Sequence, residues 1–404
     1  MIVYKNIEGL TYERMSFLVK RNKIFLIFTL FYLYITIALF ESTKGNFIPF
    51  FMEEFNINNS TISLILSINT VGAIIGSYLA GHLCETKGHK FVYIIGTVFS
   101  MIAVLIAPFT RNVFSLGLFN FIFGLGRSFI AIGVDSMVPV LSVGFESILM
   151  NITHFMYGMG SFAGQSAIGV LLSNGFTWRN IYLYLFIFFI IAVIMSLIIK
   201  TPNMQIISEK TYTKRDFYKN SYVYILIAAL TFGLISETVM NTWFINYMRV
   251  TYGLDPAGAA KYASVYFLLF ALGRLFGGFI LNKTGNLKGL AASLAVSAVF
   301  ITIGLQIKDS GLILIAVSGL FMSVTFPTMM VIISSVFNQN SSYAIGFIVT
   351  ISNITNVIMF NIVGILNDVL GTYRAFYTAP VSLVCCVIML ILIIIKEKKE
   401  NSIS

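Results

Sequence analysis

The stretch GSYLAGHLCETKGHK, from Gly76 to Lys90, occurs in a second form farther along this chain. The related stretch GRLFGGFILNKTGNL begins at Gly273, 197 residues later, and both copies lie between long apolar stretches. The matched positions are Gly76, Gly81, Glu85 and Gly88 in the first copy and Gly273, Gly278, Asn282 and Gly285 in the second. Half of the 404-residue chain is 202 residues, so this offset indicates two copies of one unit.

The composition places the chain in a lipid bilayer. Hydrophobic residues make up 58% of it and charged residues only 10%, whereas water-soluble domains carry about 25% charged residues. Apolar stretches of about 20 residues cross a bilayer, and they do so as helices because lipid offers backbone groups no hydrogen-bond partners. The sequence therefore predicts an all-α membrane protein of twelve transmembrane helices, near residues 24–50, 60–83, 91–109, 113–141, 148–173, 179–199, 219–247, 258–281, 289–306, 311–335, 343–367 and 374–395.

A second repeat divides the chain into two halves. A glycine followed, eight residues later, by Thr, an aromatic residue and Arg occurs at Gly169 and again at Gly364, an offset of 195 residues. An even number of spans separates the copies, so both halves cross the membrane in the same direction, as in transporters whose site lies between two parallel repeats. We expect an N-terminal half of six helices over 1–199, a cytoplasmic linker over 200–218 and a C-terminal half of six helices over 219–404.

The basic residues predict the orientation of the chain. Its formal net charge is +10, and a cytoplasmic N-terminus places 17 of the 26 Lys and Arg residues on the cytoplasmic side. This is the positive-inside bias of membrane proteins. We therefore expect a multi-pass protein of the cell membrane with both termini in the cytoplasm, and not a nucleic-acid-binding protein. A bundle of twelve spans encloses a pathway without a partner, so a monomer is expected.

Nothing in the sequence indicates an enzyme. The three histidines and three cysteines have no metal-ligand spacing, and no Gly-x-x-x-x-Gly-Lys-Ser/Thr phosphate loop is present. We expect no catalytic residue, metal or cofactor. A duplicated membrane bundle favours a transporter.

The repeated turn resembles the signature of a known family. The segment Gly81-His-Leu-Cys-Glu85-Thr-Lys-Gly88-His-Lys90 is similar to the loop between the second and third spans of the major facilitator superfamily, with Glu85 where that family usually has Asp. The second copy keeps a basic residue at Lys283. This resemblance implies a twelve-helix transporter that works by alternating access.

We interpret the two copies as a cytoplasmic gate. Glycine lacks a side chain, so helix ends can approach closely and the chain can turn in few residues. Glu85 can form a charge-assisted contact with Lys90 or cap a neighbouring helix. A tight turn with solvated charges is the alternative. The gate residues are Gly81, Glu85, Gly88, Lys90, Gly278, Asn282, Lys283 and Gly285.

Ionisable residues within the predicted spans are functional candidates, because each costs roughly 2.5–3.5 kcal/mol to insert at a helix centre. They are Glu41, Lys44, Arg127, Asp135, His154, Glu237 and Arg274. Asp135 lies in a mostly apolar helix, where a carboxylate is costly to ionise, so it is the candidate for proton coupling together with Arg127 and Glu41. The alternatives are a static polar network for Arg127 and Asp135, and a structural i,i+3 ion pair between Glu41 and Lys44.

Two short clusters suit a polar ligand. Glu237 and Asn241 share one helix face at i,i+4, and Trp243 adds an aromatic plane, a combination that suits a polyhydroxylated ligand. In the fifth span Asn151 and His154 are further candidates to bind substrate or relay a proton. The alternatives are an interfacial Trp243, a helix contact for Glu237 and a structural His154.

The fifth span also resembles one branch of the superfamily. Its pattern Asn151-x-x-His154-x-x-Tyr157-Gly158-x-Gly160 is similar to transporters related to the fucose–proton symporters, as are Glu237 to Trp243 and the segment Thr325-Phe-Pro-Thr328. The resemblance implies uptake of a sugar or similar polar solute by proton symport. The alternative is a proton-driven efflux pump for lipophilic compounds, which the 38 Phe and 17 Met residues favour.

Overall fold

The computed structural model describes residues 5–141, 146–201, 214–337 and 341–401, and within these ranges every regular element is a helix. The first half of the chain forms α1 (Lys5–Phe55), α2 (Asn59–Lys87), α3 (His89–Ile106), the 3-10 helix η1 (Ala107–Phe109), α4 (Val113–Leu141), α5 (Glu146–Ser173) and α6 (Trp178–Ile198). The second half forms α7 (Lys214–Lys219), α8 (Ser221–Tyr252), α9 (Pro256–Thr284), α10 (Asn286–Gln306), η2 (Lys308–Gly311), α11 (Leu312–Met322), α12 (Thr325–Phe337), α13 (Ser341–Leu370), α14 (Thr372–Ala375) and α15 (Thr378–Asn401). The prediction of an all-helical membrane protein is confirmed.

The helices match the predicted spans with several differences; the twelfth, for example, predicted over 374–395, is divided into α14 and α15. Among the described residues eleven segments are long and apolar enough to cross a membrane, and the fifth predicted span, which is not one of these eleven, is the 28-residue helix α5. The first helix has 51 residues and continues past Pro49 to Phe55, so it is much longer than the predicted 24–50. The tenth span, predicted as one helix over 311–335, is divided into α11 and α12.

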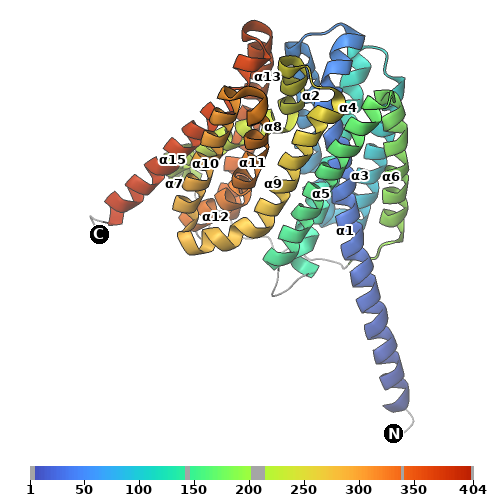
Figure 1. The fold of residues 1–404 in the computed structure, drawn as a ribbon. Helices are drawn as coiled ribbons and strands as arrows, with labels where there is room; N and C mark the ends of the chain where they lie inside the picture. Colours follow the sequence, from blue (N-terminus) through green and yellow to red (C-terminus); the bar gives the residue numbers. More distant parts are fainter. Residues whose placement is uncertain (1–4, 142–145, 202–213, 338–340, 402–404) are drawn as a thin grey trace.

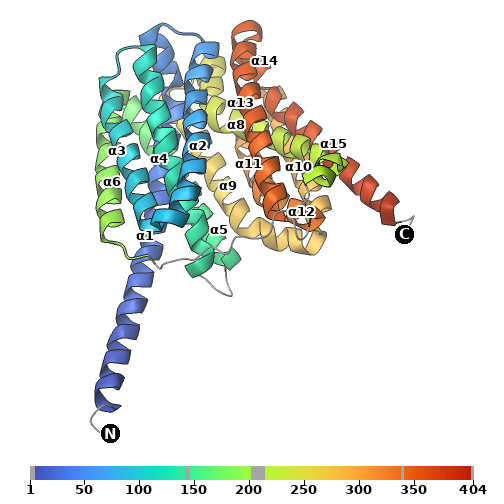
Figure 2. The same cartoon turned by 180° about the vertical axis from the view of Figure 1, so that it is seen from behind.

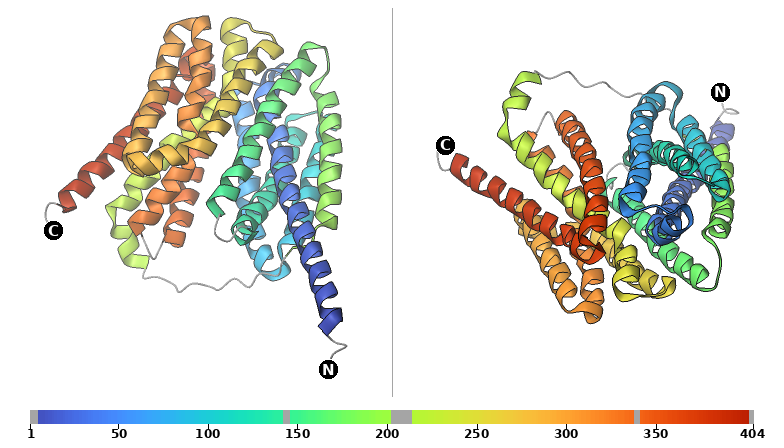
Figure 3. Two further views of the ribbon diagram at one scale, coloured as in Figure 1. Left: turned by 60° about the horizontal axis from the view of Figure 1, so that its bottom comes forward. Right: turned by 90° about the horizontal axis from the view of Figure 1, so that it is seen from above.

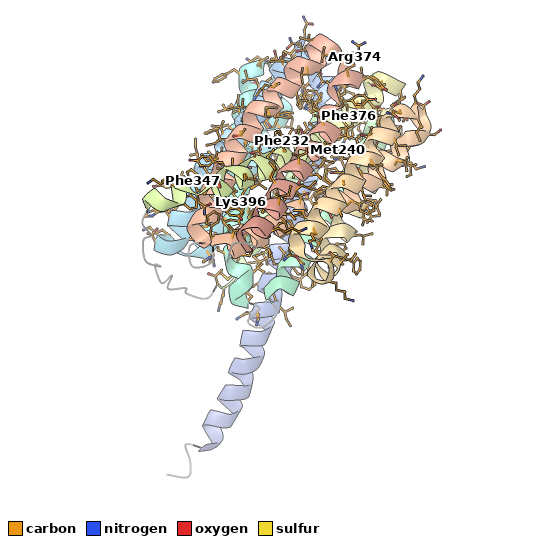
Figure 4. The ribbon with its side chains drawn as sticks, turned by 90° about the vertical axis from the view of Figure 1, so that its left-hand side faces the viewer. Phe232, Met240, Phe347, Arg374, Phe376 and Lys396 are labelled. Atoms are coloured by element: carbon orange, nitrogen blue, oxygen red, sulfur yellow. The ribbon has the colours of Figure 1, made fainter. Side chains whose placement is uncertain are left out.

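The helices form two groups that stand side by side (Figure 3, right). Helices α1 to α6 make one group, and α8 to α15 make the other. Both chain ends point to the same end of the molecule, here called the terminal end, and the opposite end is called the far end (Figures 1 and 2). On the second group, Arg374 lies at the far end, whereas Lys396 lies toward the terminal end with its ammonium 3.8 Å from the ring centre of Tyr222 (Figure 4).

The two largest seams between the groups are α5 with α9 and α2 with α13, and α1 also contacts α8. At the first seam, a Cβ on Gly169 would lie 2.2 Å from the Cβ of Ala260. At the second, a Cβ on Gly364 would lie 2.1 Å from the Oγ of Ser63. These two glycines are the matched positions of the second sequence repeat. The repeat therefore corresponds to the same kind of helix–helix contact, made once by each half of the chain.

Hydrogen bonds fasten both seams at the far end. Asp368 accepts bonds from the backbone N–H groups of Asn59 and Ser60, at 2.9 and 2.8 Å, and from both of their side chains. It thereby caps the N-terminus of α2 from the other helix group. At the α5–α9 seam the Ser173 hydroxyl donates to Asp255 at 2.8 Å. This bond, with one from the Gly258 N–H, holds the pKa of Asp255 below its ordinary value. We call these two sets the far-end clasps.

The repeated turns lie at the terminal end and have the same backbone geometry. Gly88 has φ 84° and Gly285 has φ 85°, a left-handed region that favours glycine. A Cβ on Gly81 or Gly278 would meet no atom within 4 Å. The side chains of Glu85 and Asn282 lie outside the described ones, so the gate interpretation stays a prediction.

We expect Asp368→Asn to loosen the α2–α13 seam. The amide group keeps the shape of the carboxylate but presents N–H groups to donors, so about 1 kcal/mol of clasp stability is lost and far-end opening becomes about fivefold more frequent. The measurement is the alkylation rate of a cysteine at Ser67, which is 4% exposed at this seam, in a background that lacks the three native cysteines.

The matched control is Asp309→Asn, at an exposed carboxylate of η2 at the same end. Two outcomes would show that Asp368 does not hold the seam. In the first, Asp368→Asn leaves the alkylation rate unchanged; in the second, both variants raise the rate equally.

Candidate functional site

A buried ion cluster occupies the first helix group at mid-span. The Lys44 ammonium lies 2.6 Å from the Glu41 carboxylate, which is the i,i+3 pair that the spacing predicts. Arg127 of α4 lies 3.5 Å from the other oxygen of Glu41, and Lys44 also donates to the side-chain oxygen of Asn69 at 3.0 Å. The Glu41 and Lys44 side chains are only 17% and 15% exposed. One carboxylate is thus held between two cations.

A small polar cavity lies beside this cluster, between the two helix groups. It measures about 50 Å³ and is lined by Glu41, Ser42 and Lys44 of α1, Tyr157 and Ser161 of α5, Asn241 and Thr242 of α8, and Phe267 of α9. The helices meet closely here, since a Cβ on Gly45 would lie 3.2 Å from the Thr242 carbonyl oxygen. A water molecule takes up about 30 Å³ in the liquid, whereas ligand pockets commonly measure about 300–1,000 Å³. In this conformation the cavity is therefore too small for a sugar.

Asp135 belongs to a second cluster, closer to the terminal end. The Tyr34 hydroxyl donates a short hydrogen bond to Asp135, and the Nε2 atom of His154 lies 3.9 Å from the same carboxylate. The Tyr34 ring meets the rings of His154 and Tyr157 edge to face, at centroid distances of 5.5 and 6.1 Å. Three helices, α1, α4 and α5, thus surround one carboxylate that has a histidine in place of a permanent cation.

A third cluster comes from the second helix group. The Arg274 guanidinium lies 3.6 Å from the Glu237 carboxylate, and both side chains are less than a fifth exposed. Asn241 lies four residues after Glu237 on the same face of α8, and its side-chain oxygen is buried without a hydrogen-bond partner. Because Asn241 also lines the cavity, it connects this ion pair to the space between the helix groups.

The break between α11 and α12 positions Arg274. Proline has no backbone N–H, so Pro327 cannot donate to the carbonyl of Ser323, four residues earlier. That carbonyl instead accepts a bond from the Nε atom of Arg274 at 3.4 Å. The Arg274 guanidinium also lies 4.6 Å from the ring centre of Phe270. The interrupted helix therefore holds the cation that faces Glu237.

The structure brings some predicted residues together and separates others. Arg127 and Asp135, which share a helix, belong to different clusters. Trp243 is 1% exposed and packs against Phe360 with ring centres 6.0 Å apart, away from the cavity lining. Of the five substrate candidates, Asn241 lines the cavity. Glu237 lies one turn before Asn241 on α8 and does not line the cavity itself. His154 lies beside Asp135. Asn151 lies one turn from the start of α5.

Several participants have no clear functional signal in the sequence by themselves. Tyr34 and Tyr157 stand in apolar stretches, where a tyrosine is usually a core residue, and Asn69 is a single amide in an apolar helix. Arg274 was identified as ionisable but not as the partner of Glu237. The available signal was Pro327, because a proline within a span leaves a carbonyl that needs another donor.

Comparison with known proteins identifies the chain's relatives. The sequence profile described as Major Facilitator Superfamily matches residues 30–286 and 225–404. A protein of Staphylococcus aureus named as a probable nitrate transporter, NarT, is 26% identical over 254 residues, which are 61% of this chain and 64% of NarT. The chain therefore spans less than two thirds of that relative.

Solved structures show the same fold. The crystal structure of a D-xylose–proton symporter superimposes with a TM-score of 0.74 at 12% identity, covering 91% of this chain and 96% of that one. The superfamily transporter FucP in its outward conformation gives a TM-score of 0.65 at 18% identity, covering 92% and 99%. Family and fold are those of transporters.

We expect strong energetic coupling between Glu237 and Arg274. Removing one partner of a buried ion pair leaves an uncompensated charge, at about 3–5 kcal/mol, so Glu237→Gln and Arg274→Gln together should destabilise less than the sum of the single changes. The coupling energy, about 1–3 kcal/mol, is measured by thermal unfolding in a double-mutant cycle.

The control cycle uses Glu54 and Arg179, a pair 2.5 Å apart near the far end whose side chains are 37% and 34% exposed. Exposed pairs couple by about 1 kcal/mol or less. Equal coupling in the two cycles would contradict the assignment of Glu237 and Arg274 to a buried charged site.

Proposed function

Because this chain belongs to the major facilitator superfamily, we propose that it is a secondary transporter that moves a small polar solute through the cell membrane by proton-coupled alternating access. The observation that carries this proposal is a polar cavity between the two helix groups, lined by the Glu41–Lys44 pair on one side and by Asn241 on the other, with a second ion pair, Glu237 and Arg274, one turn away from Asn241. Charges are costly in a bilayer and mark transport pathways. A cavity lined by both groups changes its access when the groups rock against each other.

We assign proton uptake to Asp135. Glu41 lies between Lys44 and Arg127, which favour its ionised form, whereas the described side chains in contact with Asp135 are a tyrosine and a histidine. The Asp135 side chain is 41% exposed and the His154 side chain 36%, so a proton can reach this carboxylate, and a carboxylate without a permanent cation takes up a proton more readily than one between two cations. Glu41 and Arg127 then connect the proton site to the solute site, because α1 and α4 carry members of both clusters.

A neutral polyhydroxylated solute, such as a sugar, suits the site. The three carboxylates Glu41, Asp135 and Glu237 balance three cations at Lys44, Arg127 and Arg274, and the buried side-chain oxygen of Asn241 has no hydrogen-bond partner. The fold is also that of a D-xylose–proton symporter. The cavity of about 50 Å³ must widen to accept a sugar. The polar lining supports this function better than efflux of lipophilic compounds.

A small anion is the second candidate. Protonation of Asp135 would leave three cations against two carboxylates, so the site would gain one positive charge. Relatives at 24 and 26% identity are named as probable nitrate transporters. We place both termini in the cytoplasm, so the far-end clasps would close the outer side and the repeated turns would form the cytoplasmic gate.

The first test is transport by proteoliposomes under an inward proton gradient. We expect accumulation of a labelled monosaccharide that stops when a protonophore collapses the gradient. Accumulation of labelled nitrate instead would establish the anion as the solute, and gradient-driven dye extrusion with no uptake of either solute would establish efflux.

The second test separates coupling from solute binding. Asp135→Asn cannot exchange a proton, so we expect gradient-driven accumulation to fall to the level without a gradient, while exchange of solute across the membrane continues. Asp309→Asn, outside the site, is the control and should accumulate solute normally. Undiminished accumulation by Asp135→Asn would remove that residue from the coupling mechanism.

A further inference from the structure

A second and larger cavity lies outside the central site, on the second helix group. It measures about 510 Å³ and lies between α9, α10 and the end of α11. Its wall comes from α9 between Gly273 and Thr284, from α10 between Lys288 and Val296, and from Leu320 to Val324. Of these three helices only α9 also lines the 50 Å³ cavity, through Phe267. The two cavities therefore have different walls.

The cavity opens on the outer surface of the helix bundle, where apolar side chains are exposed. Its lining side chains Phe276 and Ile280 are 56% and 63% exposed, although both belong to membrane-spanning or adjoining turns of α9. Ala292 of α10 lines the cavity and is also exposed. Small residues, among them Gly277 and Gly289, leave the space between the helices unfilled. An apolar groove that opens toward the bilayer interior accepts an apolar chain.

One end of the cavity is cationic. Helix α9 runs toward the terminal end and α10 begins there (Figure 1), so Thr284 and Lys288 mark the terminal end of the cavity. From Gly273 to Thr284 the wall extends roughly 16 Å at 1.5 Å per residue. Lys288 is exposed, and no lining residue carries a carboxylate. The exposed Lys283 adds a second positive charge to this turn.

The start of α10 reinforces that charge. Its N-cap is Gly285, which offers no side-chain hydrogen bond to the first turn. Free N–H groups and the helix dipole give such a terminus a partial positive charge, to which phosphate groups bind. Lys288 and Gly289, both in the first turn of α10, also line the cavity. A long apolar cavity thus ends at a lysine and an uncapped helix.

We propose that this cavity binds a glycerophospholipid with a net negative headgroup. One acyl chain lies along α9 and α10, and the phosphate lies between Lys288 and the start of α10. Basic groups between transmembrane helices at the membrane surface bind anionic headgroups in this way. A neutral lipid or a lipophilic solute would make no use of the cation, so the charge distinguishes this occupant from other apolar ones.

The cationic end is not a general property of the repeated turn. At the offset of 197 residues, the position that matches Lys288 in the first copy is Phe91. The first copy carries Lys87 at the end of α2, before its turn. The lysine at the mouth of the cavity therefore belongs to the second half alone, and Lys87 offers a matched control at the same end of the molecule.

The test is native mass spectrometry of the purified protein with added phosphatidylglycerol or phosphatidylcholine of identical acyl chains. We expect wild type to retain one phosphatidylglycerol molecule in preference to phosphatidylcholine. Lys288→Glu should weaken retention of phosphatidylglycerol about fivefold or more, since one basic residue near an anionic lipid surface contributes about 1 kcal/mol. Lys288→Arg should retain it, because that change keeps the charge.

Two further variants complete the test. Ala292→Phe places a ring in the cavity from an exposed position, so it should reduce retention of both lipids, whereas Lys87→Glu should change nothing. Equal retention of the two lipids by wild type, equal retention by wild type and Lys288→Glu, or no retention by wild type would each overturn the proposal. If Ala292→Phe fails to fold, the comparison of Lys288→Glu with Lys288→Arg decides the question alone.

Discussion

The assembly of this protein depends on close contact between helices that lipid does not push together. Lipid chains are as apolar as leucine, so packing and polar bonds must hold transmembrane helices to each other. Here the two helix groups meet where a glycine faces a small residue, Gly169 at Ala260 and Gly364 at Ser63. The far-end clasps lie one turn away from these glycines. The α5–α9 seam continues toward the terminal end, where a Cβ on Gly158 would lie 2.3 Å from the Cβ of Ala271.

The same constraint governs the charged residues. A bilayer does not solvate an isolated charge, so each ionised group needs a partner of opposite sign. Glu41 has Lys44 and Arg127, and Glu237 has Arg274. Asp135 differs, because its neighbours are a tyrosine and a histidine. This difference in surroundings is the reason for proposing Asp135 as the proton site and the other two carboxylates as parts of the solute site.

The broken helix connects packing with chemistry. Pro327 leaves the Ser323 carbonyl without its backbone donor, and Arg274 supplies the missing bond from a different helix. The same guanidinium faces Glu237, whose other neighbour is Asn241 at the cavity. A backbone irregularity in the tenth span thus determines where a cation lies in the eighth.

By itself the sequence determined that the chain is a duplicated bundle of twelve membrane helices, because hydrophobic length, glycine spacing and charge placement are local properties. It also predicted the Glu41–Lys44 pair, since residues three apart on a helix are neighbours. Only the tertiary structure decided that Arg127 joins that pair, that Tyr34 and His154 surround Asp135, and that Trp243 packs away from the cavity. These contacts join helices that are far apart in the sequence. Helical periodicity predicts which residues share a helix face, but it does not predict which other helix packs against that face.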